Sequence, residues 1–440
     1  MAENENSTAL LERVRAGRVC VGIIGLGYVG LPLALEFARA GLTVTGLEVD
    51  ARKVEQINAG HSYIPDVAEA ELAPLVAAGR LRASSEFALL QEVDAAIICV
   101  PTPLRKSRDP DISYVISAAD EVARFAHADM LVVLESTTYP GTTDELLVPR
   151  LNQRGFKVGE DVFVAFSPER IDPGNPHFGV RNTPKVIGGI TPRCTEVASV
   201  LYGYAVDQVV PVSSARAAEM VKLLENTFRA VNIGLINEMA LICDKLELDI
   251  WEVISAATTK PYGFMPFYPG PGLGGHCLPI DPLYLSWKLK TVNYNARFIE
   301  LADDVNSSMP RYVVGKVADA LNSWRKPVNG SRILILGVAY KRNVNDIRES
   351  PAFEIMDLLR EKGALVYYND PYVPDLHQAG WDLQSITLDD ATLASTDCVV
   401  VVTDHSRYDW QWIADRAQLV VDTRNALRDV PASKAQIVKL

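Results

Sequence analysis

The stretch RVCVGIIGLGYVGLPLALEFARAGLTVTGLEVD, residues 18–50, decides the fold of the amino-terminal part of the chain. An apolar run leads into a glycine-rich turn, a helical run follows and ends at Gly41, and a second apolar, partly β-branched run ends near Glu48. This order of segments predicts one βαβ unit, in which the two strands are parallel and the helix crosses between them.

The turn of this unit contains Gly25, Gly27 and Gly30, which form the pattern GxGxxG. The pattern is a weak signal alone, but here a strand precedes it, a helix follows it, and the acid Glu48 closes the next strand about twenty residues later. Such a turn lets backbone amides approach a pyrophosphate at the positive end of a helix. Because an acid after the second strand accepts hydrogen bonds from a ribose diol and repels a 2'-phosphate, the sequence predicts NAD as cofactor, a preference that nearby Lys53 would soften.

The sequence predicts three domains, residues 17–205, 206–325 and 326–440. The βαβ unit belongs to the first of them. The first is predicted to be a doubly wound parallel sheet, because four more strand candidates alternate with helix-length segments: AAIICV, MLVVLES, DVFVAFS and PKVIGG. The third shows a second α/β pattern in RILILGVAY, ALVYYNDP, DCVVVVT and QLVVDTR. It lacks a GxGxxG turn, so we expect a Rossmann-like fold with a different binding task.

The middle domain is predicted to be helical. From Ser213 to about Leu246 apolar residues recur at helical spacing without a proline, which indicates one long helix. Its apolar content exceeds what one exposed stripe needs. Two interpretations stay open: a spine between domains that also packs against a second subunit, or a helix buried within one chain.

Composition excludes several classes of protein. With 440 residues, 48% hydrophobic and 22% charged, the chain has the composition of a globular protein of several domains. The net charge of -12 argues against a general nucleic-acid surface. The polar first residues and the lack of any 18-residue apolar stretch predict neither a signal peptide nor a membrane span, and hence a cytoplasmic protein.

One of six cysteines, Cys277, lies in a glycine-rich loop, PGLGGHCLPIDP, while the other five fall in apolar strand or helix patterns. A catalytic thiolate and a metal ligand are the chemical interpretations, and a small apolar packing residue is the plain one. A metal site needs three or four ligands, and no second Cys/His cluster lies near Cys277 in the sequence, so no metal site is predicted. In a protein that also has a dinucleotide-binding turn, a thiolate suggests the two-step oxidation of an alcohol through a thiohemiacetal and a thioester.

Seven motifs follow one another from Val21 to about Arg424: GIIGLGYVGLPLA, VPTP, ESTTYPGTT, FSPERIDPGN, KLLEN, GPGLGGHCLPIDP and GVAYKRNVNDIRES. On these motifs the chain resembles the UDP-sugar 6-dehydrogenases, the family that contains UDP-glucose dehydrogenase. The histidine in GGHC and the form PERIDPG are similar to the branch that acts on UDP-N-acetylhexosamines. The resemblance implies NAD-dependent, four-electron oxidation at C6 of UDP-N-acetylglucosamine for surface polysaccharide such as O-antigen, with UDP-N-acetylmannosamine or UDP-glucose as alternative substrates.

The resemblance also implies roles for a catalytic set. Cys277 would be the nucleophile, and Lys222 and Asn226, four residues apart on the long helix, would both reach an oxyanion. Asp281 would pair with Lys222 and order a water, and the same residue also suits the cap of the helix that follows it. Two more residues are implied to act on water, Glu169 in hydrolysis of the thioester and Thr137 in holding the water and the cofactor.

The remaining implied residues bind ligands. The cofactor set is Gly25, Gly27, Tyr28, Val29, Gly30, Glu48, Lys53, Pro101, Thr102 and Arg348. The substrate set is Glu169, Arg170, Lys222, Asn226, Tyr268, Gly274, His276, Lys341 and Arg424. For Arg424 a surface ion pair is the plain alternative, and His276 is expected to contact the hexosamine or support the loop rather than to serve as a base. The implied assembly is a homodimer, with a homotetramer as the alternative.

Two hypotheses from other classes remain at this stage. A cysteine hydrolase or transferase, with one of the six histidines as base, explains the thiol but leaves the dinucleotide turn without a purpose. A nucleotide-sugar sensor without enzymatic activity would keep the binding loops and lose the reactive residues, yet Cys277, Lys222 and Asp281 are all present. Both alternatives therefore explain less of the sequence than the dehydrogenase does.

Overall fold

The computed structural model describes residues 5–64, 66–105, 109–172, 175 and 177–440, with side chains from residue 9 onward. Contacts divide the chain into two compact units, Met1–Glu225 with Leu283–Tyr294, and Asn226–Pro282 with Asn295–Leu440. Two residues of the PERIDPG motif, 173 and 174, lie outside the described part. We describe each unit in turn.

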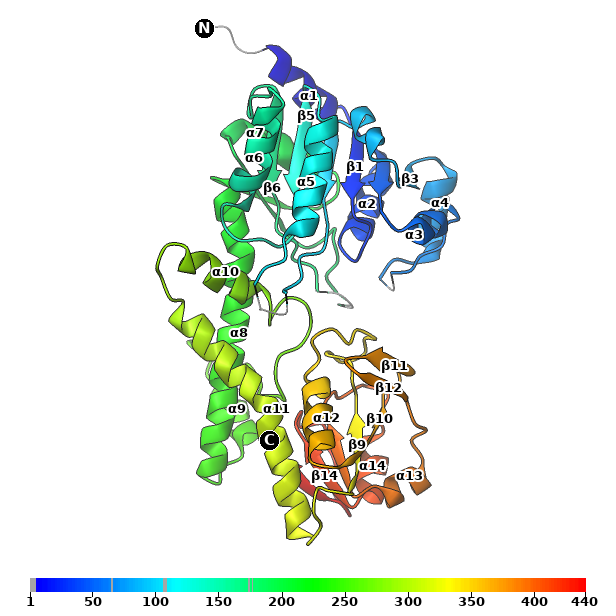
Figure 1. Cartoon of the computed structure of the whole chain (residues 1–440), viewed down its shortest axis with the longest axis vertical. Helices are drawn as coiled ribbons and strands as arrows, with labels where there is room; N and C mark the ends of the chain where they lie inside the picture. Colours follow the sequence, from blue (N-terminus) through cyan, green and yellow to red (C-terminus); the bar gives the residue numbers. More distant parts are fainter. Residues whose placement is uncertain (1–4, 65, 106–108, 173–174, 176) are drawn as a thin grey trace. The chain divides into compact units, whose positions relative to one another are not determined.

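The first unit is built on an eight-stranded sheet in the order β3-β2-β1-β4-β5-β6-β7-β8 (Figure 1). The predicted doubly wound architecture is confirmed, and the predicted parallel pairing holds for every pair in this sheet except β6 and β7, which are antiparallel. The strands are β1 (Cys20–Ile24), β2 (Thr43–Leu47), β3 (Leu81–Ser84), β4 (Ala95–Ile98), β5 (Met130–Leu134), β6 (Val162–Phe166), β7 (Lys185–Gly189) and β8 (Val209–Val212).

Helices bury both faces of this sheet. One core contains side chains of α1 (Glu5–Arg15), α2 (Gly30–Arg39), α4 (Glu69–Ala77) and α7 (Pro192–Tyr202). The core on the other face contains α5 (Ser113–Phe125), the 3-10 helix η1 (Phe87–Glu92), the π-helix η2 (Thr143–Leu147) and α6 (Val148–Gln153). A further helix, α3 (Ala51–Asn58), follows β2. Since Leu10 of α1 is fully buried, the core of this unit begins before residue 17, the predicted boundary of the first domain.

The long helix α8 spans Ala215–Lys245 and agrees with the helix expected from Ser213 to about Leu246. The division between the units falls within it, after Glu225. Its second half packs with α9 (Ile250–Thr258) in a small apolar cluster that includes Ile236 and Ile254. The other helices of the middle segment are α10 (Asp281–Lys290) and α11 (Arg297–Ser323).

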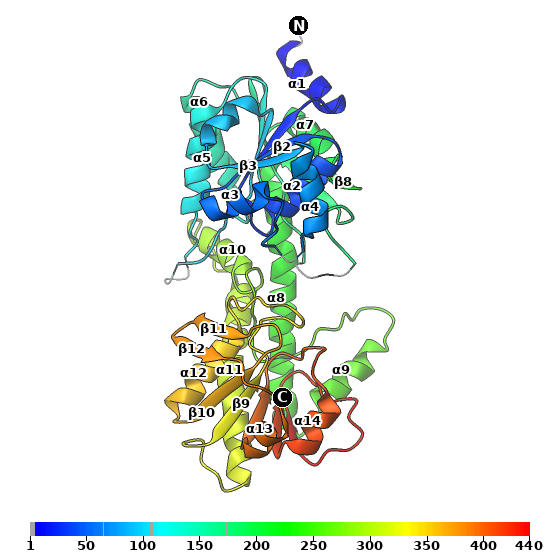
Figure 2. The same ribbon diagram turned by 90° about the vertical axis from the view of Figure 1, so that its right-hand side faces the viewer.

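The second unit contains a five-stranded parallel sheet in the order β10-β9-β13-β14-β15 (Figure 2). Four strands match those expected from the sequence, and β15 was not expected because its sequence, QIVK, is short and half polar. The strands are β9 (Arg332–Leu336), β10 (Leu365–Asn369), β13 (Cys398–Val401), β14 (Leu419–Asp422) and β15 (Gln436–Lys439). Its helices are α12 (Pro351–Glu361), α13 (Asp390–Ser395) and α14 (Trp410–Arg416), and β11 (Asp375–Gln378) pairs with β12 (Trp381–Gln384) in a hairpin.

All six cysteines are free thiols in the structure. Cys99, Cys194, Cys243 and Cys398 are buried, whereas Cys20 and Cys277 are half-buried. Among the described residues, no helix is both long and apolar enough to span a membrane.

Candidate functional site

The glycine turn between β1 and α2 has the shape that a dinucleotide requires. Gly25 adopts a φ of 90°, and a Cβ atom added to Gly30 would lie 1.9 Å from the Gly25 carbonyl oxygen, so neither position tolerates a side chain. A Cβ added to Gly27 would meet no described atom within 4 Å, which leaves its backbone open to a ligand. Since no side chain caps α2 at Val29, the amides of its first turn suit a pyrophosphate.

The acid that follows β2 is held in place by backbone amides. Glu48 is 7% exposed, and its two carboxylate oxygens accept hydrogen bonds from the N–H groups of Leu26 (3.1 Å) and Asp50 (3.2 Å). The Nζ atom of Lys53 lies 3.9 Å from the same carboxylate. A carboxylate oxygen has lone pairs to spare beyond one such bond, so Glu48 fits a ribose diol and the turn as a whole fits NAD.

Further predicted residues follow the carboxyl ends of parallel strands in the first sheet. Pro101 and Thr102 come after β4, Thr137 after β5 and Glu169 after β6. Thr102 is buried, and its carbonyl accepts a hydrogen bond from the Tyr284 hydroxyl (3.0 Å). Since the carboxyl ends of parallel strands meet at one edge, the fold brings these residues to the edge where ligands bind in open α/β sheets.

Helix α8 places a lysine against this edge. The Nζ atom of Lys222 donates a hydrogen bond to the Thr137 hydroxyl at 2.5 Å, and the two residues are 6% and 9% exposed. Arg170, next to Glu169, is engaged elsewhere: it pairs with Glu225 (2.7 Å) and donates to the Pro184 carbonyl (2.6 Å). The structure therefore unites Lys222 with Thr137, while Arg170 supports the loop around Pro184.

In the second unit Asn226 and Asp281 form a hydrogen-bonded pair that the sequence did not predict. The amide nitrogen of Asn226 donates to the carboxylate of Asp281 at 2.6 Å, and Asp281 is fully buried. The backbone N–H of Asp281 donates to the Cys277 carbonyl (2.8 Å), so the cysteine loop ends directly in α10. Asp281 is thus the first residue of a helix and also a buried hydrogen-bonding carboxylate. On α8, Asn226 lies one turn after Lys222.

The glycines before Cys277 allow the loop to lie against the loop that follows β9. A Cβ atom on Gly274 or on Gly275 would come within 2.7 Å of Tyr340. The Gly275 N–H donates to the Arg348 carbonyl at 3.0 Å. This packing brings the cysteine loop next to the segment that carries Lys341 and Arg348. The guanidinium of Arg348 pairs with Asp346 at 2.6 Å. The half-buried His276 lies in the same packed loop.

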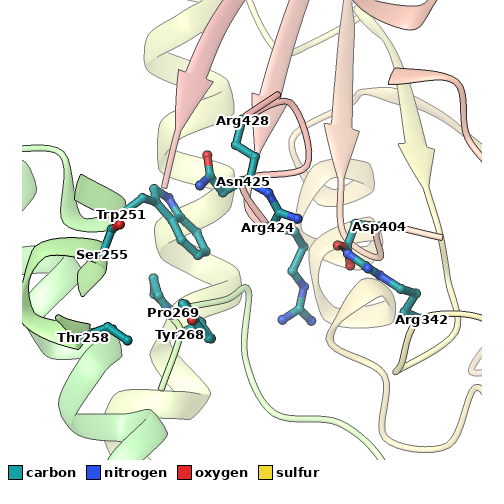
Figure 3. A pocket seen from close by; sticks show the side chains of 10 residues that line it. All are labelled: Trp251, Ser255, Thr258, Tyr268, Pro269, Arg342, Asp404, Arg424, Asn425 and Arg428. Carbon is teal, nitrogen blue, oxygen red and sulfur yellow. Dashed lines mark hydrogen bonds and ion pairs between the residues drawn. The ribbon is translucent and has the colours of Figure 1, made fainter. Parts of the chain in front are cut away.

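A cavity of about 540 Å³ opens in the second unit (Figure 3). Its walls combine an aromatic pair with several arginines, and the rings of Trp251 and Tyr268 stack with centroids 6.2 Å apart and an interplanar angle of 16°. The lining residues are Trp251, Ser255, Thr258, Tyr268, Pro269, Arg342, Asp404, Arg424, Asn425 and Arg428.

The charge of this cavity is positive. Its lining contains three arginines and one carboxylate: Arg342, Arg424, Arg428 and Asp404. The carboxylate of Asp404 pairs with Arg342. Burial and the charge of Arg342 together lower the pKa of Arg424 to about 10, although Asp422 opposes them. The Nε atom of Arg424 donates to the Val402 carbonyl (2.9 Å), which holds the guanidinium in the wall of the cavity. A concentration of arginines in a partly closed pocket suits a phosphorylated ligand.

Sequence reasoning missed most of the residues that line this cavity, among them Trp251, Arg342, Asn425 and Arg428. Arg342 and Arg428 had a weak signal, since one adjoins Lys341 and the other lies four residues after Arg424. Trp251 had none, because it belongs to α9, far away in the chain. Among the described residues, nothing forms a hydrogen bond with the buried indole N–H of Trp251 or with the buried side-chain oxygen of Asn425.

The described residues hold no group of three or more His, Cys, Asp or Glu side chains that suits a metal ion.

The class of protein that these features indicate is a nicotinamide-dependent dehydrogenase of a phosphorylated substrate. The features are the dinucleotide turn, the buried lysine at the sheet edge, the half-buried thiol and the arginine-lined cavity.

Comparison with known families identifies the chain more closely. Residues 18–206 match the NAD binding domain, residues 216–308 the central domain and residues 334–429 the UDP binding domain of the UDP-glucose/GDP-mannose dehydrogenase family. The chain belongs to this family. It is an NAD-dependent nucleotide-sugar dehydrogenase, in agreement with the family resemblance of its motifs.

Named relatives from several organisms are similar to the chain over nearly its whole length. The chain is 37% identical to an NDP-N-acetyl-D-galactosaminuronic acid dehydrogenase of Ralstonia nicotianae, over 92% of this chain and 95% of the relative. It is 34% identical to a UDP-N-acetyl-D-mannosamine dehydrogenase of Pyrococcus horikoshii, over 93% and 96%. A solved structure of the UDP-D-ManNAc dehydrogenase from Pyrococcus horikoshii matches with a TM-score of 0.86 and 32% identity, over 96% of this chain and 98% of that one.

The carboxylate of Glu48 gives a prediction about cofactor choice. We expect Glu48→Gln to weaken NAD binding about tenfold, because a neutral amide loses the charge-assisted hydrogen bonds to the ribose. NADP binding should weaken less or improve, since the charge that repels its 2'-phosphate is gone. Titration calorimetry with both dinucleotides measures the ratio. Glu55→Gln, the same change at an exposed position of α3, is the control and should leave the ratio as in the unchanged protein.

Proposed function

We propose that this protein oxidises C6 of a UDP-N-acetylhexosamine to the uronate with NAD. The observation that carries the proposal is the packing of the Cys277 loop against the loop that contains Lys341, within the unit that also holds the arginine-lined cavity. A reactive thiol and a pocket for a phosphorylated ligand thus belong to one compact unit.

The identity of the hexosamine is part of the proposal. The sequence motifs resemble those of the N-acetylhexosamine branch, and from them alone UDP-N-acetylglucosamine is the first candidate. Relatives with 34–37% identity bear names with N-acetylmannosamine or N-acetylgalactosaminuronic acid. We therefore take UDP-N-acetylmannosamine as the first candidate and UDP-N-acetylglucosamine as the second. The product would serve the synthesis of surface polysaccharide.

The reaction requires a covalent intermediate on Cys277. Bound NAD supplies a hydride acceptor for each of two oxidations, which together remove four electrons. The thiolate forms a carbon–sulfur bond to the C6 aldehyde and gives a thiohemiacetal, whose oxidation leaves a thioester. Water then adds to the thioester carbon, the carbon–sulfur bond breaks, and the carboxylate leaves as the thiolate is restored.

The buried polar residues suit the charges that develop in these steps. The ammonium of Lys222 and the amide of Asn226, one turn apart on α8, would stabilise the oxyanion of the thiohemiacetal. Asp281 would orient Asn226, and Thr137, which bonds Lys222, would hold a water near the cofactor. Glu169 would receive the proton of the water that cleaves the thioester.

The cavity suits the UDP portion of the substrate. Arg342, Arg424 and Arg428 would neutralise the diphosphate, and the stacked rings of Trp251 and Tyr268 offer a flat apolar face for the uracil. The unpartnered Trp251 N–H and Asn425 oxygen would supply a donor and an acceptor.

The stoichiometry of the reaction tests the proposal. We expect about two NADH per UDP-N-acetylhexosamine consumed, since both oxidations occur before release. NADH absorbance and chromatography of the nucleotide sugars measure the ratio for UDP-N-acetylmannosamine, UDP-N-acetylglucosamine, UDP-N-acetylgalactosamine and UDP-glucose. A ratio near one, or turnover of none of the N-acetylhexosamines, would contradict it.

Replacing the thiol separates binding from covalent chemistry. We expect Cys277→Ser to bind the UDP-sugar within about threefold of the unchanged protein while acid formation falls by a factor of about 10³ or more, because a serine alkoxide is far harder to generate than a thiolate near neutral pH. Mass spectrometry of the products gives the rate. Cys20→Ser, at the other half-buried cysteine, is the control. Full acid formation by Cys277→Ser would rule out the covalent step.

We also propose that the protein is a homodimer through α8. Exposed apolar side chains recur every four or seven residues along this helix, at Leu224, Phe228, Leu235 and Ile242, and so form one apolar stripe. We expect Leu235→Glu to shift the sedimentation equilibrium from dimer to monomer, because a carboxylate in an apolar interface must be desolvated. Leu365→Glu, at an exposed leucine of β10, is the control. A monomeric unchanged protein would refute the proposal.

A further inference from the structure

A single lysine, Lys185, pairs with two buried carboxylates, those of Glu169 and Glu135. Lys185, the first residue of β7, has its Nζ atom 3.3 Å from Glu169 and forms a short hydrogen bond with Glu135, which follows β5. The Tyr202 hydroxyl of α7 donates to the other oxygen of Glu135 at 2.5 Å. The side chains of Lys185, Glu135 and Glu169 are 5%, 0% and 10% exposed.

Each carboxylate oxygen of Glu169 accepts one hydrogen bond. One accepts the backbone N–H of Ile171 at 2.5 Å, and the other faces Lys185. Lys185 also bonds Glu135, whose other oxygen accepts the Tyr202 hydroxyl, so the ammonium has little freedom to leave. This arrangement fixes the direction in which the Glu169 carboxylate points.

The charges of the cluster are unequal. Burial raises the pKa of Glu135 to about 7, although Lys185 opposes this, so Glu135 is the carboxylate that takes up a proton below neutral pH. Burial also raises the pKa of Glu169, but Lys185, the Ile171 amide and the nearby Lys222 together hold it below its usual range. Cys99 and Tyr202, the other titratable groups that face the cluster, stay neutral because burial raises their pKa values.

We propose that Lys185 is a positioning residue for hydrolysis of the thioester, which keeps Glu169 ionised and oriented while Glu135 and Tyr202 hold the lysine in place. The inference rests on the proposed function of Glu169. In that step the water oxygen bonds to the thioester carbon and the carbon–sulfur bond breaks toward the thiolate. One proton of the water passes to Glu169, and the other stays on the new carboxylic acid until it ionises to solvent. A protonated Glu169 accepts no such proton.

A pair of variants tests the role of Lys185. Glu135→Gln imitates the protonated Glu135 and keeps the lysine, and the double variant Lys185→Met with Glu135→Gln also removes the charge and the hydrogen-bond donors of the lysine. Activity requires ionised Glu169, so it rises with pH through the pKa of that group. Loss of the cation raises this pKa, and we expect the acidic limb of kcat to move upward by about one pH unit or more in the double variant but to stay in place in Glu135→Gln.

Two further variants guard against effects of folding alone. Lys185→Arg keeps a cation at this position, so the acidic limb of kcat should lie at the same pH as in the unchanged protein. Asp94→Asn breaks the pair with Arg13 before β4 and should lower stability without moving the limb. If the double variant does not fold, Lys185→Gln, which keeps a donor and loses the charge, should show the same upward shift.

The outcomes separate the two proposals. Should the unchanged protein form no NADH with any UDP-sugar, the proposed function fails. If it turns over but the limb is the same in Glu135→Gln and in the variants without the lysine charge, the role of Lys185 is refuted and the proposed function stands. An upward shift that is absent in Lys185→Arg supports the role, and accumulation of the thioester at acidic pH, seen by mass spectrometry, assigns the limb to hydrolysis.

Discussion

The constraint on which the rest of the structure depends is the burial of parallel strands on both faces. A parallel sheet needs crossover helices, and helices on both faces exclude water from its strands. Strands β1 to β6 run in the same direction and end at one edge, so residues far apart in the sequence, such as Glu48, Thr102 and Thr137, are brought to that edge. The ligand-binding residues of the first unit follow from this geometry.

Buried polar groups at this edge need partners, and the structure supplies them in small sets. Lys222 bonds Thr137, and Lys185 bonds Glu135 and Glu169. Each ammonium would be expensive to bury alone. In the second unit the same requirement joins Asn226 to the fully buried Asp281.

The glycines before Cys277 have a packing role that the sequence did not suggest. We expected Gly274 to offer its backbone to the sugar, and that remains a prediction. The structure shows a steric reason as well, because a side chain at Gly274 or Gly275 would collide with Tyr340. Close packing of two loops, rather than ligand contact alone, therefore restricts these positions.

Local patterns were enough to predict both sheets, the long helix and the NAD turn, because hydrophobic periodicity and glycine spacing act within a few neighbouring residues. The same patterns singled out Cys277. They did not reveal that β6 and β7 are antiparallel, that Trp251 of α9 lines a cavity with Arg424, or that Lys185 lies between Glu135 and Glu169. These features depend on contacts between residues distant in the chain, which form when apolar faces are buried together and which no local pattern records.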